Sequence, residues 1–195
     1  MPFVFVLYMF LNIKKFMLIL YMEIQLKKFN MEDVKDNNVV VLIGKRDTGK
    51  SFLCKDILHH HQNIPVGQVI SGTEGANQFY SKIIPKLFIH EEFDTQIIQN
   101  MIKRQKILME KINNGDNNID PRSFLILDDC LYDNTWAKDK YMRSVFMNGR
   151  HFKILFLLTM QYALGIPPNL RTNIDFIFIL RENYVSNRKR LYDHY

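Results

Sequence analysis

The chain has little of what holds small secreted proteins together, because it contains only two cysteines, Cys54 and Cys130, in 195 residues. Disulfide-stabilised secreted domains use many more, and these two lack the spacing of a metal site. Both lie in or beside segments that we expect in the core. We therefore interpret them as small buried side chains in a protein of a reducing compartment.

Flexible linkers and internal repeats are also missing. The sequence has 8 glycines and 6 prolines, and they do not gather into a Gly/Ser-rich or Pro-rich stretch. The one clear polar break is the segment 113–118. Apolar residues make up 47% and charged residues 24%, which excludes a largely disordered chain. This length and composition predict one α/β domain with a sizeable core.

An excess of negative charge is absent as well. The formal net charge is +6, and the pI is about 9.2. A positive balance favours an anionic partner such as nucleic acid, although many proteins with a moderate positive charge bind none.

A long uninterrupted apolar run is missing, although residues 3–22 are mostly apolar. Lys14 and Lys15 stand in the middle of this stretch, and a lysine at the centre of a membrane helix costs about 3 kcal/mol. The flanking pieces are shorter than the roughly 20 residues of a span, and the stretch lacks the features of a secretory signal. We expect residues 1–30 to be an apolar extension packed on the domain as a strand or helix. An extension upstream of the true start ranks second and a membrane anchor third.

What the sequence does contain is a phosphate-binding loop pattern, G-x-x-x-x-G-K-[ST]. Its residues are Gly44, Lys45, Arg46, Asp47, Thr48, Gly49, Lys50 and Ser51. A buried strand is predicted over 39–43 and a helix over 52–58, which is the context that the loop requires. Backbone N–H groups and the helix N-terminus would hold the phosphates. Lys50 would reach the β- and γ-phosphates, and Ser51 would bind Mg²⁺.

The rest of the chain alternates between short apolar runs and helical patterns. Such alternation predicts an α/β fold with a mostly parallel central sheet and helices on both faces. Further strands are expected at 66–70, 87–90, 124–127, 154–158 and 176–180. Helices are expected at 76–84, 94–112 and 137–148, with a short helix or turn beginning at 167–168.

Two carboxylates follow the apolar strand 124–127. Ligands of parallel sheets gather at the carboxyl ends of the strands, so we expect Asp128 and Asp129 to meet the phosphate loop there. Asp128 would hold Mg²⁺ directly or through water. Asp129 would orient and activate an attacking water.

Polar side chains near the next strand are further candidates. Thr159 and Gln161 are expected just past it, facing the γ-phosphate. Arg150 and Arg171 flank the strand, and an arginine reaching a neighbouring subunit's nucleotide would stabilise charge on the phosphoryl group. Of the two, Arg150 is our first choice.

Several other features have ordinary structural explanations. His59, His60 and His61 point in different directions around a helix, so we expect them at its C-terminus rather than around a metal. The aromatic residues near 132–146 are expected to pack. The basic run 188–190 fits a solvated surface as well as it fits DNA phosphates.

The chain resembles the DNA-packaging ATPases of nucleocytoplasmic large DNA viruses, a branch of the FtsK/HerA superfamily. The resemblance covers roughly residues 38–182. Its most specific segment runs from Asn148-Gly149-Arg150-His151 through Thr159-Met160-Gln161-Tyr162 to 165–175. The other matching segments are Gly44–Ser51, Ser71-Gly72-Thr73-Glu74, 86–90 and Leu127-Asp128-Asp129-Cys130.

This resemblance implies an additional-strand P-loop NTPase, in which another strand separates the Asp-bearing strand from the phosphate-loop strand. Lys50 and Ser51 would take Walker A roles, and Asp128 and Asp129 would take Walker B roles. Gln161 would be the family's glutamine and Arg150 its arginine finger. The wider class usually has Glu where Asp129 stands, and the Asp129 side chain is one methylene shorter. Relatives also continue beyond the last strand, so the domain 31–195 is left open as a C-terminally truncated form.

The implied function is an ATPase motor, with ATP and Mg²⁺, that translocates double-stranded DNA into a capsid. The implied partners are DNA, identical subunits in a ring, and capsid or inner-membrane proteins of the virion, without a small-molecule acceptor. The implied location is the viral factory in the host cytoplasm or the virion. The alternatives are an inactive nucleotide-binding paralogue with an assembly role and a P-loop nucleotide kinase.

Overall fold

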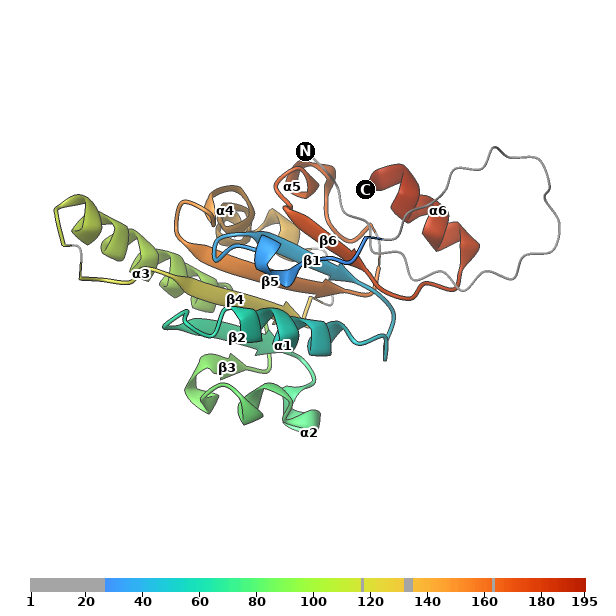
Figure 1. Cartoon of the computed structure of the whole chain (residues 1–195), viewed down its shortest axis with the longest axis horizontal. Helices are drawn as coiled ribbons and strands as arrows, with labels where there is room; N and C mark the ends of the chain where they lie inside the picture. The colour runs from blue at the N-terminus through green and yellow to red at the C-terminus, as the bar shows by residue number, and fades with distance from the viewer. Residues whose placement is uncertain (1–26, 117, 132–134, 163) are drawn as a thin grey trace.

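Six parallel strands form one sheet in the order β3-β2-β4-β5-β1-β6 (Figure 1). The structure is a computed structural model that describes residues 27–116, 118–131, 135–162 and 164–195. The strands are β1 (Val39–Ile43), β2 (Gly67–Ser71), β3 (Ile89–His90), β4 (Ser123–Asp128), β5 (Ile154–Met160) and β6 (Phe176–Ile179). The predicted α/β class is confirmed. Strand β5 lies between β4 and β1, so the additional-strand order is confirmed as well.

Helices cover both faces of this sheet. They are α1 (Lys50–His60), α2 (Glu74–Asn77), α3 (Thr95–Asn113), α4 (Lys140–Asn148), α5 (Pro168–Arg171) and α6 (Val185–His194). Asp94 and Asp139 accept backbone N–H groups at the first turns of α3 and α4, which explains where these two helices begin.

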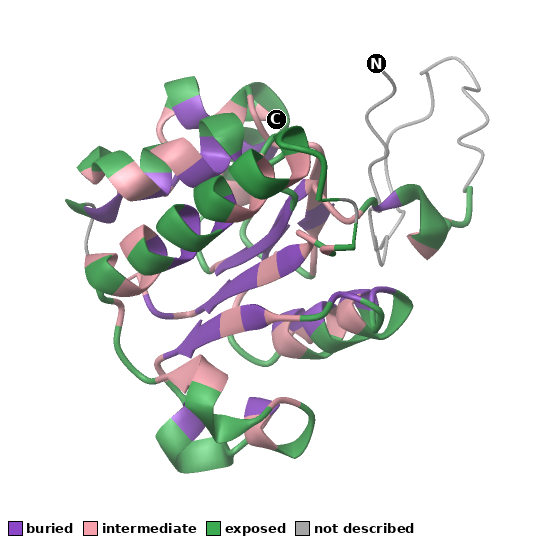
Figure 2. Cartoon of the chain, turned by 90° about the vertical axis from the view of Figure 1, so that its left-hand side faces the viewer, coloured by how far each residue is buried: buried purple, intermediate pink, exposed green. Residues whose placement is uncertain are grey.

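The side chains of β1 alternate between two hydrophobic cores. Val39, Val41 and Ile43 pack with α3, α4 and α5. Val40 and Leu42 pack with α1 on the other face. All five residues of β1 are buried, as is expected for a central strand covered on both sides. Figure 2 shows the buried strands between helices whose outer surfaces are exposed.

Several elements differ from the sequence-based expectation. The strand expected at 87–90 is shorter, because Lys86–Phe88 forms a 3₁₀ turn before β3. The helix expected at 137–148 begins at Lys140, after a 3₁₀ turn over Thr135–Lys138. The continuous helix expected over 76–84 is wrong, because α2 ends at Asn77 and Gln78 takes a left-handed conformation with φ 48°. A separate 3₁₀ turn follows at Tyr80–Lys82. Helix α6, which follows β6, was not predicted; the strongly charged run 188–190 hides its apolar positions, since Leu191 is its one buried residue.

The expected extension 1–30 lies mostly outside the described residues. Of its last residues, Phe29 packs edge-on against Phe176 and Phe178 of β6, at ring-centroid distances of 5.7 and 5.1 Å. Met31–Asp33 then forms a 3₁₀ turn that leads into β1. The segment just before the domain boundary is therefore part of the packed domain.

Candidate nucleotide-binding site

The glycine loop connects β1 to α1, and two of its backbone positions require glycine. Gly49 has φ 93°, which side chains rarely adopt. A Cβ on Gly44 would lie 2.6 Å from Thr48 Oγ1 and 2.9 Å from Leu180 Cβ. Thr48 Oγ1 donates to the Lys45 carbonyl at 2.8 Å and closes the loop. These contacts shape a tight cradle whose tip, Arg46 and Asp47, is exposed.

Lys50 begins α1 and is 5% exposed. Its ammonium donates to the Lys45 carbonyl at 3.0 Å and lies 3.5 Å from Asp129 Oδ2. The loop therefore holds a buried cation whose carboxylate partner comes from a distant part of the chain.

Asp128, the last residue of β4, accepts three hydroxyl hydrogen bonds. Its Oδ2 accepts from Ser51 Oγ at 2.7 Å and from Tyr80 Oη at 2.8 Å. Its Oδ1 accepts from Thr159 Oγ1 at 2.7 Å. The carboxylate is 2% exposed, so its orientation is set by neighbours on α1, β5 and the segment after α2. As expected, Asp128 contacts the phosphate loop, through its hydrogen bond with Ser51.

Asp129 follows directly in a left-handed conformation, with φ 47°. This region is strained for most residues but is tolerated by Asp and Asn. Its backbone N–H donates to Thr159 Oγ1 at 3.0 Å. The turn directs the carboxylate of Asp129 to Lys50, while Asp128 faces Ser51 and the hydroxyl groups around it.

Thr159 was expected past its strand, and that placement is wrong. It lies inside β5, which extends to Met160, and it is buried. Its hydroxyl accepts from the backbone of Asp129 and donates to Asp128. Strand register explains this position, because Leu127 of β4 pairs with Leu158 of β5 and the next residues on the two strands become neighbours.

Gln161 comes one residue after β5 and is exposed. The preceding Met160 pairs with Ile43, the last residue of β1, and its carbonyl accepts the Gly44 N–H at 3.0 Å. Gln161 therefore stands beside the start of the phosphate loop, at the same edge of the sheet.

Tyr80 is a site residue that our reading of the sequence missed. Its ring is fully buried, and Glu74 accepts the backbone N–H groups of Tyr80 and Ser81 at 2.9 and 2.8 Å. Burial, then the nearby Cys54 thiol and the Asp128 carboxylate, raise the pKa of Tyr80 well above its usual value. The phenol stays protonated and donates to Asp128. Nothing in the local sequence signals this role, because the contact spans 48 positions.

The two arginines make contacts with residues other than those described above. Arg150 Nη2 is 3.2 Å from Asp175 Oδ1, and Asp175 Oδ2 accepts the N–H of Val39, the first residue of β1. Arg150 therefore lies near the amino ends of the strands. The phosphate loop follows the last residue of β1, so the site of the same chain lies at the opposite, carboxyl ends. Arg171 donates to the Ile166 carbonyl at 2.8 Å, and its guanidinium lies 5.3 Å from the Tyr195 ring centroid.

The segment after β6 packs on the phosphate loop, which was not expected. A Cβ added to Gly44 or to Gly49 would lie within 4.0 Å of the Leu180 side chain. Lys45 Nζ is 3.4 Å from Glu182 Oε1 and 3.5 Å from the centroid of the Tyr184 ring. Only Lys50, of the two loop lysines, therefore pairs with a carboxylate that follows β4.

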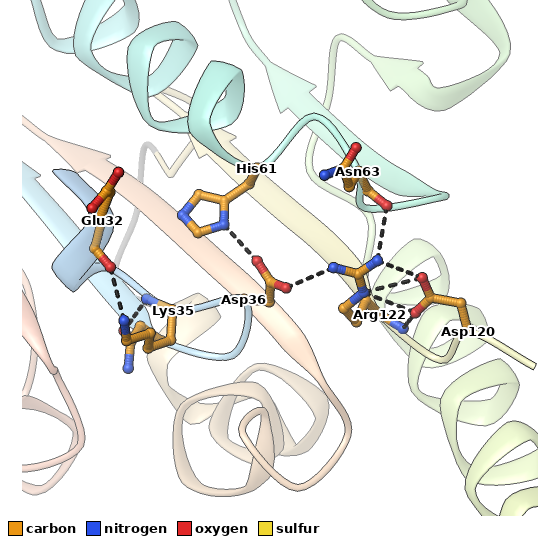
Figure 3. A network of polar contacts seen from close by, with 8 residues as sticks. Glu32, Lys35, Asp36, His61, Asn63, Asp120 and Arg122 are labelled. Carbon is orange, nitrogen blue, oxygen red and sulfur yellow. Dashed lines mark hydrogen bonds and ion pairs between the residues drawn. The ribbon is translucent and has the colours of Figure 1, made fainter. Parts of the chain in front are cut away.

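The remaining predictions concern the histidines and cysteines. His59 and His60 end α1, and His61 follows as its C-cap residue, as expected. His61 contacts Asp36, which also bonds Arg122 (Figure 3). Both cysteines are free and buried, as expected. Burial, followed by the charge of Asp128, raises the pKa of Cys130 to about 12.

A metal ion bound here would meet hard oxygen ligands. Ser51 Oγ and Asp128 Oδ2 are 2.7 Å apart, so a hydroxyl and a carboxylate converge on one place. Among the described residues, no group of three or more His, Cys, Asp or Glu could hold a metal. Mg²⁺ commonly binds through one or two carboxylates together with substrate phosphates, so the donor set fits Mg²⁺ better than Zn²⁺.

The sheet order, the glycine cradle and the carboxylates at the end of β4, two strands away from β1, define the P-loop NTPase fold. No family model matches the chain. The sequence is similar to uncharacterized protein 075L of invertebrate iridescent virus 6, with 47% identity over 157 residues, covering 80% of this chain and 59% of that protein. It is also similar to uncharacterized protein L437 of Acanthamoeba polyphaga mimivirus, with 39% identity, covering 80% of this chain and 56% of that protein.

Among solved structures, the chain is similar to the genome packaging NTPase B204 of Sulfolobus turreted icosahedral virus 2. The TM-score to its sulfate complex is 0.58, with 18% identity, covering 83% of this chain and 82% of B204. B204 has also been solved with ATP-gammaS. The resemblance to viral packaging ATPases is therefore confirmed for the fold, and the similar sequences come from large DNA viruses.

The chain spans less than two thirds of the curated relatives described above. Within the part of the chain that the structure describes, the helices are too short or too polar to cross a bilayer. The membrane-anchor alternative for residues 3–22 concerns residues outside that part.

Proposed function

We propose that the chain hydrolyses ATP and couples this reaction to the translocation of double-stranded DNA into a virus particle. One observation carries the proposal. Lys50 and Ser51 of the phosphate loop lie 3.5 and 2.7 Å from Asp129 and Asp128, which follow and end β4. A cation and a hydroxyl for phosphate and metal thus face two carboxylates at one edge of the sheet, which supports a site for triphosphate cleavage.

Each residue has a distinct proposed role. The backbone from Gly44 to Gly49 would bind the phosphates, and Lys50 would neutralise the β- and γ-phosphates. Ser51 and Asp128 would hold Mg²⁺, which when bound supplies positive charge that stabilises the negative charge on the phosphate oxygens. Asp129 would orient and activate water. Gln161 would contact the γ-phosphate region from the loop after β5.

The Lys50–Asp129 ion pair fits this assignment. Lys50 is almost fully buried, and a buried ammonium needs an anionic partner. Asp129 is that partner in the structure. A bound triphosphate would supply a stronger anionic partner and would leave the Asp129 carboxylate available to accept a hydrogen bond from water.

The DNA-motor part of the proposal is supported by the relatives and by charge. B204 is described as a genome packaging NTPase, and the sequence relatives come from large DNA viruses. A net charge of +6 suits a polyanionic partner. We propose a homo-oligomeric ring, in which Arg150 or Arg171 would reach a neighbour's nucleotide. We also propose contacts with capsid or inner-membrane proteins of the virion, and action in the viral factory or the virion.

The test is ATP turnover by the purified chain, with and without double-stranded DNA, over a series of salt concentrations. We expect turnover that DNA stimulates, with stimulation falling as salt rises because phosphate contacts release counterions. Lys50→Ala should lower turnover by about two orders of magnitude or more, because its charge has no substitute at the phosphates. Lys55→Ala, on the exposed side of the same helix, is the matched control and should match the parent.

Each alternative gives a different result. Turnover of Lys50→Ala near that of the parent would remove Lys50 from the site. ATP binding without turnover, with or without DNA, would favour an inactive assembly protein. Phosphate transfer that needs a nucleoside or nucleotide acceptor would favour a kinase.

A further inference from the structure

An exposed aromatic ring stands beside the phosphate loop, and no step proposed above uses it. Tyr184 follows β6 and is 62% exposed. We propose that the Tyr184 ring is the stacking platform for the base of the bound nucleoside triphosphate. This inference rests on the proposed function, because it assigns the base-binding part of the same site.

The first argument is proximity. The ring centroid of Tyr184 lies 3.5 Å from Nζ of Lys45, the second residue of the phosphate loop. The ring is therefore within one side chain's length of the loop backbone. Other exposed tyrosines are placed differently. Tyr192 is farther along α6 and is 85% exposed, and the Tyr162 hydroxyl accepts a hydrogen bond from Arg190 at 3.3 Å.

The second argument is that Tyr184 is held in place. The Glu182 carboxylate accepts the Tyr184 backbone N–H at 2.8 Å and Asn187 Nδ2 at 3.0 Å. It also pairs with Lys45 at 3.4 Å, and its side chain is 8% exposed. Burial acts to raise the pKa of Glu182, but these hydrogen bonds outweigh burial and lower it. The carboxylate stays ionised and ties Tyr184 to the loop, and such preorganisation favours binding.

The third argument concerns the open face of the ring. Lys45 covers part of Tyr184, yet most of the side chain remains accessible. Stacking of another flat aromatic group on an exposed aromatic ring is favourable, because it buries apolar surface of both rings. A nucleobase attached to phosphates in the adjacent loop is such a group. Because every base has a π-face, stacking tolerates different bases, so we expect ATP and GTP to bind with similar affinity.

The experiment compares ligands with and without a base. Dissociation constants of ATP, GTP and inorganic tripolyphosphate, each with Mg²⁺, are measured by calorimetry on the whole chain and its variants. Tyr184→Ala should weaken ATP and GTP about tenfold and leave tripolyphosphate within about twofold. Tyr184→Phe keeps the ring and should match the parent. Tyr192→Ala removes an exposed tyrosine of α6, the helix that begins directly after Tyr184, and should also match the parent.

The outcomes separate this inference from the proposed function. A parent chain that binds none of the three ligands would contradict the proposed function. Unchanged ATP affinity in Tyr184→Ala, with normal parent binding, would overturn the stacking role alone. Equal weakening of ATP and tripolyphosphate would also overturn it, because Tyr184 would then act on the loop. Should Tyr184→Ala unfold, Tyr184→Leu keeps apolar bulk without a π-face and should show the same base-specific loss.

Discussion

The two carboxylates at the end of β4 are adjacent in the sequence and have different surroundings. Asp128 is buried and accepts three hydroxyl donors. Asp129 is turned by a positive φ toward Lys50. A carboxylate held by three donors keeps one orientation and suits a supporting role, whereas one facing a single cation can change partners. The geometry therefore favours Asp129 over Asp128 for activation of water.

We expect Asp129→Asn to retain nucleotide binding and to lose cleavage. Asn tolerates the left-handed conformation and keeps the shape of the side chain, so the loop should remain intact. The charge that orients water is lost, and turnover should fall by about two orders of magnitude. Single-turnover hydrolysis beside a nucleotide titration measures both effects. Normal cleavage by this variant would show that another group activates the water.

We expect Tyr80→Phe to destabilise the protein by about 2 kcal/mol. The change removes a buried donor to a charged acceptor and leaves the ring volume in place. Urea unfolding followed by fluorescence measures the loss. Tyr192→Phe alters an exposed hydroxyl and serves as the control, with no expected change. A Tyr80→Phe variant as stable as the control would mean that Asp128 does not depend on the phenol.

At the level of elements, the amino end of the sheet is joined by charged contacts between segments far apart in the sequence (Figure 3). Asp36, before β1, bonds both His61, after α1, and Arg122, before β4. Arg122 also pairs with Asp120 at 2.7 Å and donates to the Asn63 carbonyl at 3.1 Å. These contacts connect the segments before β1 and β4 with the C-terminal end of α1, the helix that begins with Lys50.

Asp36→Asn tests this connection through its dependence on pH. Burial acts to raise the pKa of Asp36, but hydrogen bonds from Arg122 and His61 outweigh burial and lower it below 3.8. A lowered folded pKa adds stability above the unfolded pKa, and this stability is lost as the pH falls through the folded pKa. Because Asp36 is 35% exposed, we expect a loss of about 1 kcal/mol or less at pH 7.

Urea unfolding of parent and Asp36→Asn from pH 7 down to pH 3 gives the comparison. The difference between the two proteins should be constant near neutrality and shrink below about pH 4, as the parent carboxylate takes up its proton. Glu110→Gln, on an exposed position of α3, is the control. A difference that persists unchanged to pH 3 would mean that the ionised carboxylate is not its source.

At the level of the whole molecule, the carboxyl ends and the amino ends of the parallel strands carry different functional residues. The carboxyl edge carries the glycine loop, Asp128, Asp129 and Gln161, whereas Arg150 lies at the amino edge on Asp175. Arg150 therefore stands apart from the site of its own chain. Any action of Arg150 on a nucleotide requires a second subunit, and for this reason the assembled state decides its role.

We expect Arg150→Ala to leave nucleotide affinity of the isolated subunit unchanged and to lower turnover of the assembled protein at least tenfold. The lost contact with Asp175 is a half-exposed ion pair that contributes little to stability. Mixing Arg150→Ala subunits with Lys50→Ala subunits should restore part of the turnover. At some interfaces an Arg150→Ala subunit would supply the intact Lys50 site, and its Lys50→Ala neighbour would supply the intact Arg150. Mixed assemblies without any recovery would contradict action on a neighbour, and Arg171 would be the next residue to test.

The sequence by itself determined the elements of this protein and the chemistry placed at their ends. Runs of apolar residues identify β1, β4 and β5, because a strand covered on both faces has no polar side. The pattern Gly44 to Ser51 identifies the loop, because few residues other than glycine fit a positive φ or a close backbone approach. Asp128 and Asp129 were predictable because they follow an apolar strand directly.

Only the tertiary structure decided which of these ends meet. Pairing of Leu127 with Leu158 brings Thr159 to Asp128, and a break after α2 brings in Tyr80. The same packing places Arg150 at the far edge and Tyr184 beside Lys45. Periodicity and turn residues describe local conformation, whereas strand order, register and helix docking depend on contacts between distant segments. The residues around the carboxylates come from those contacts.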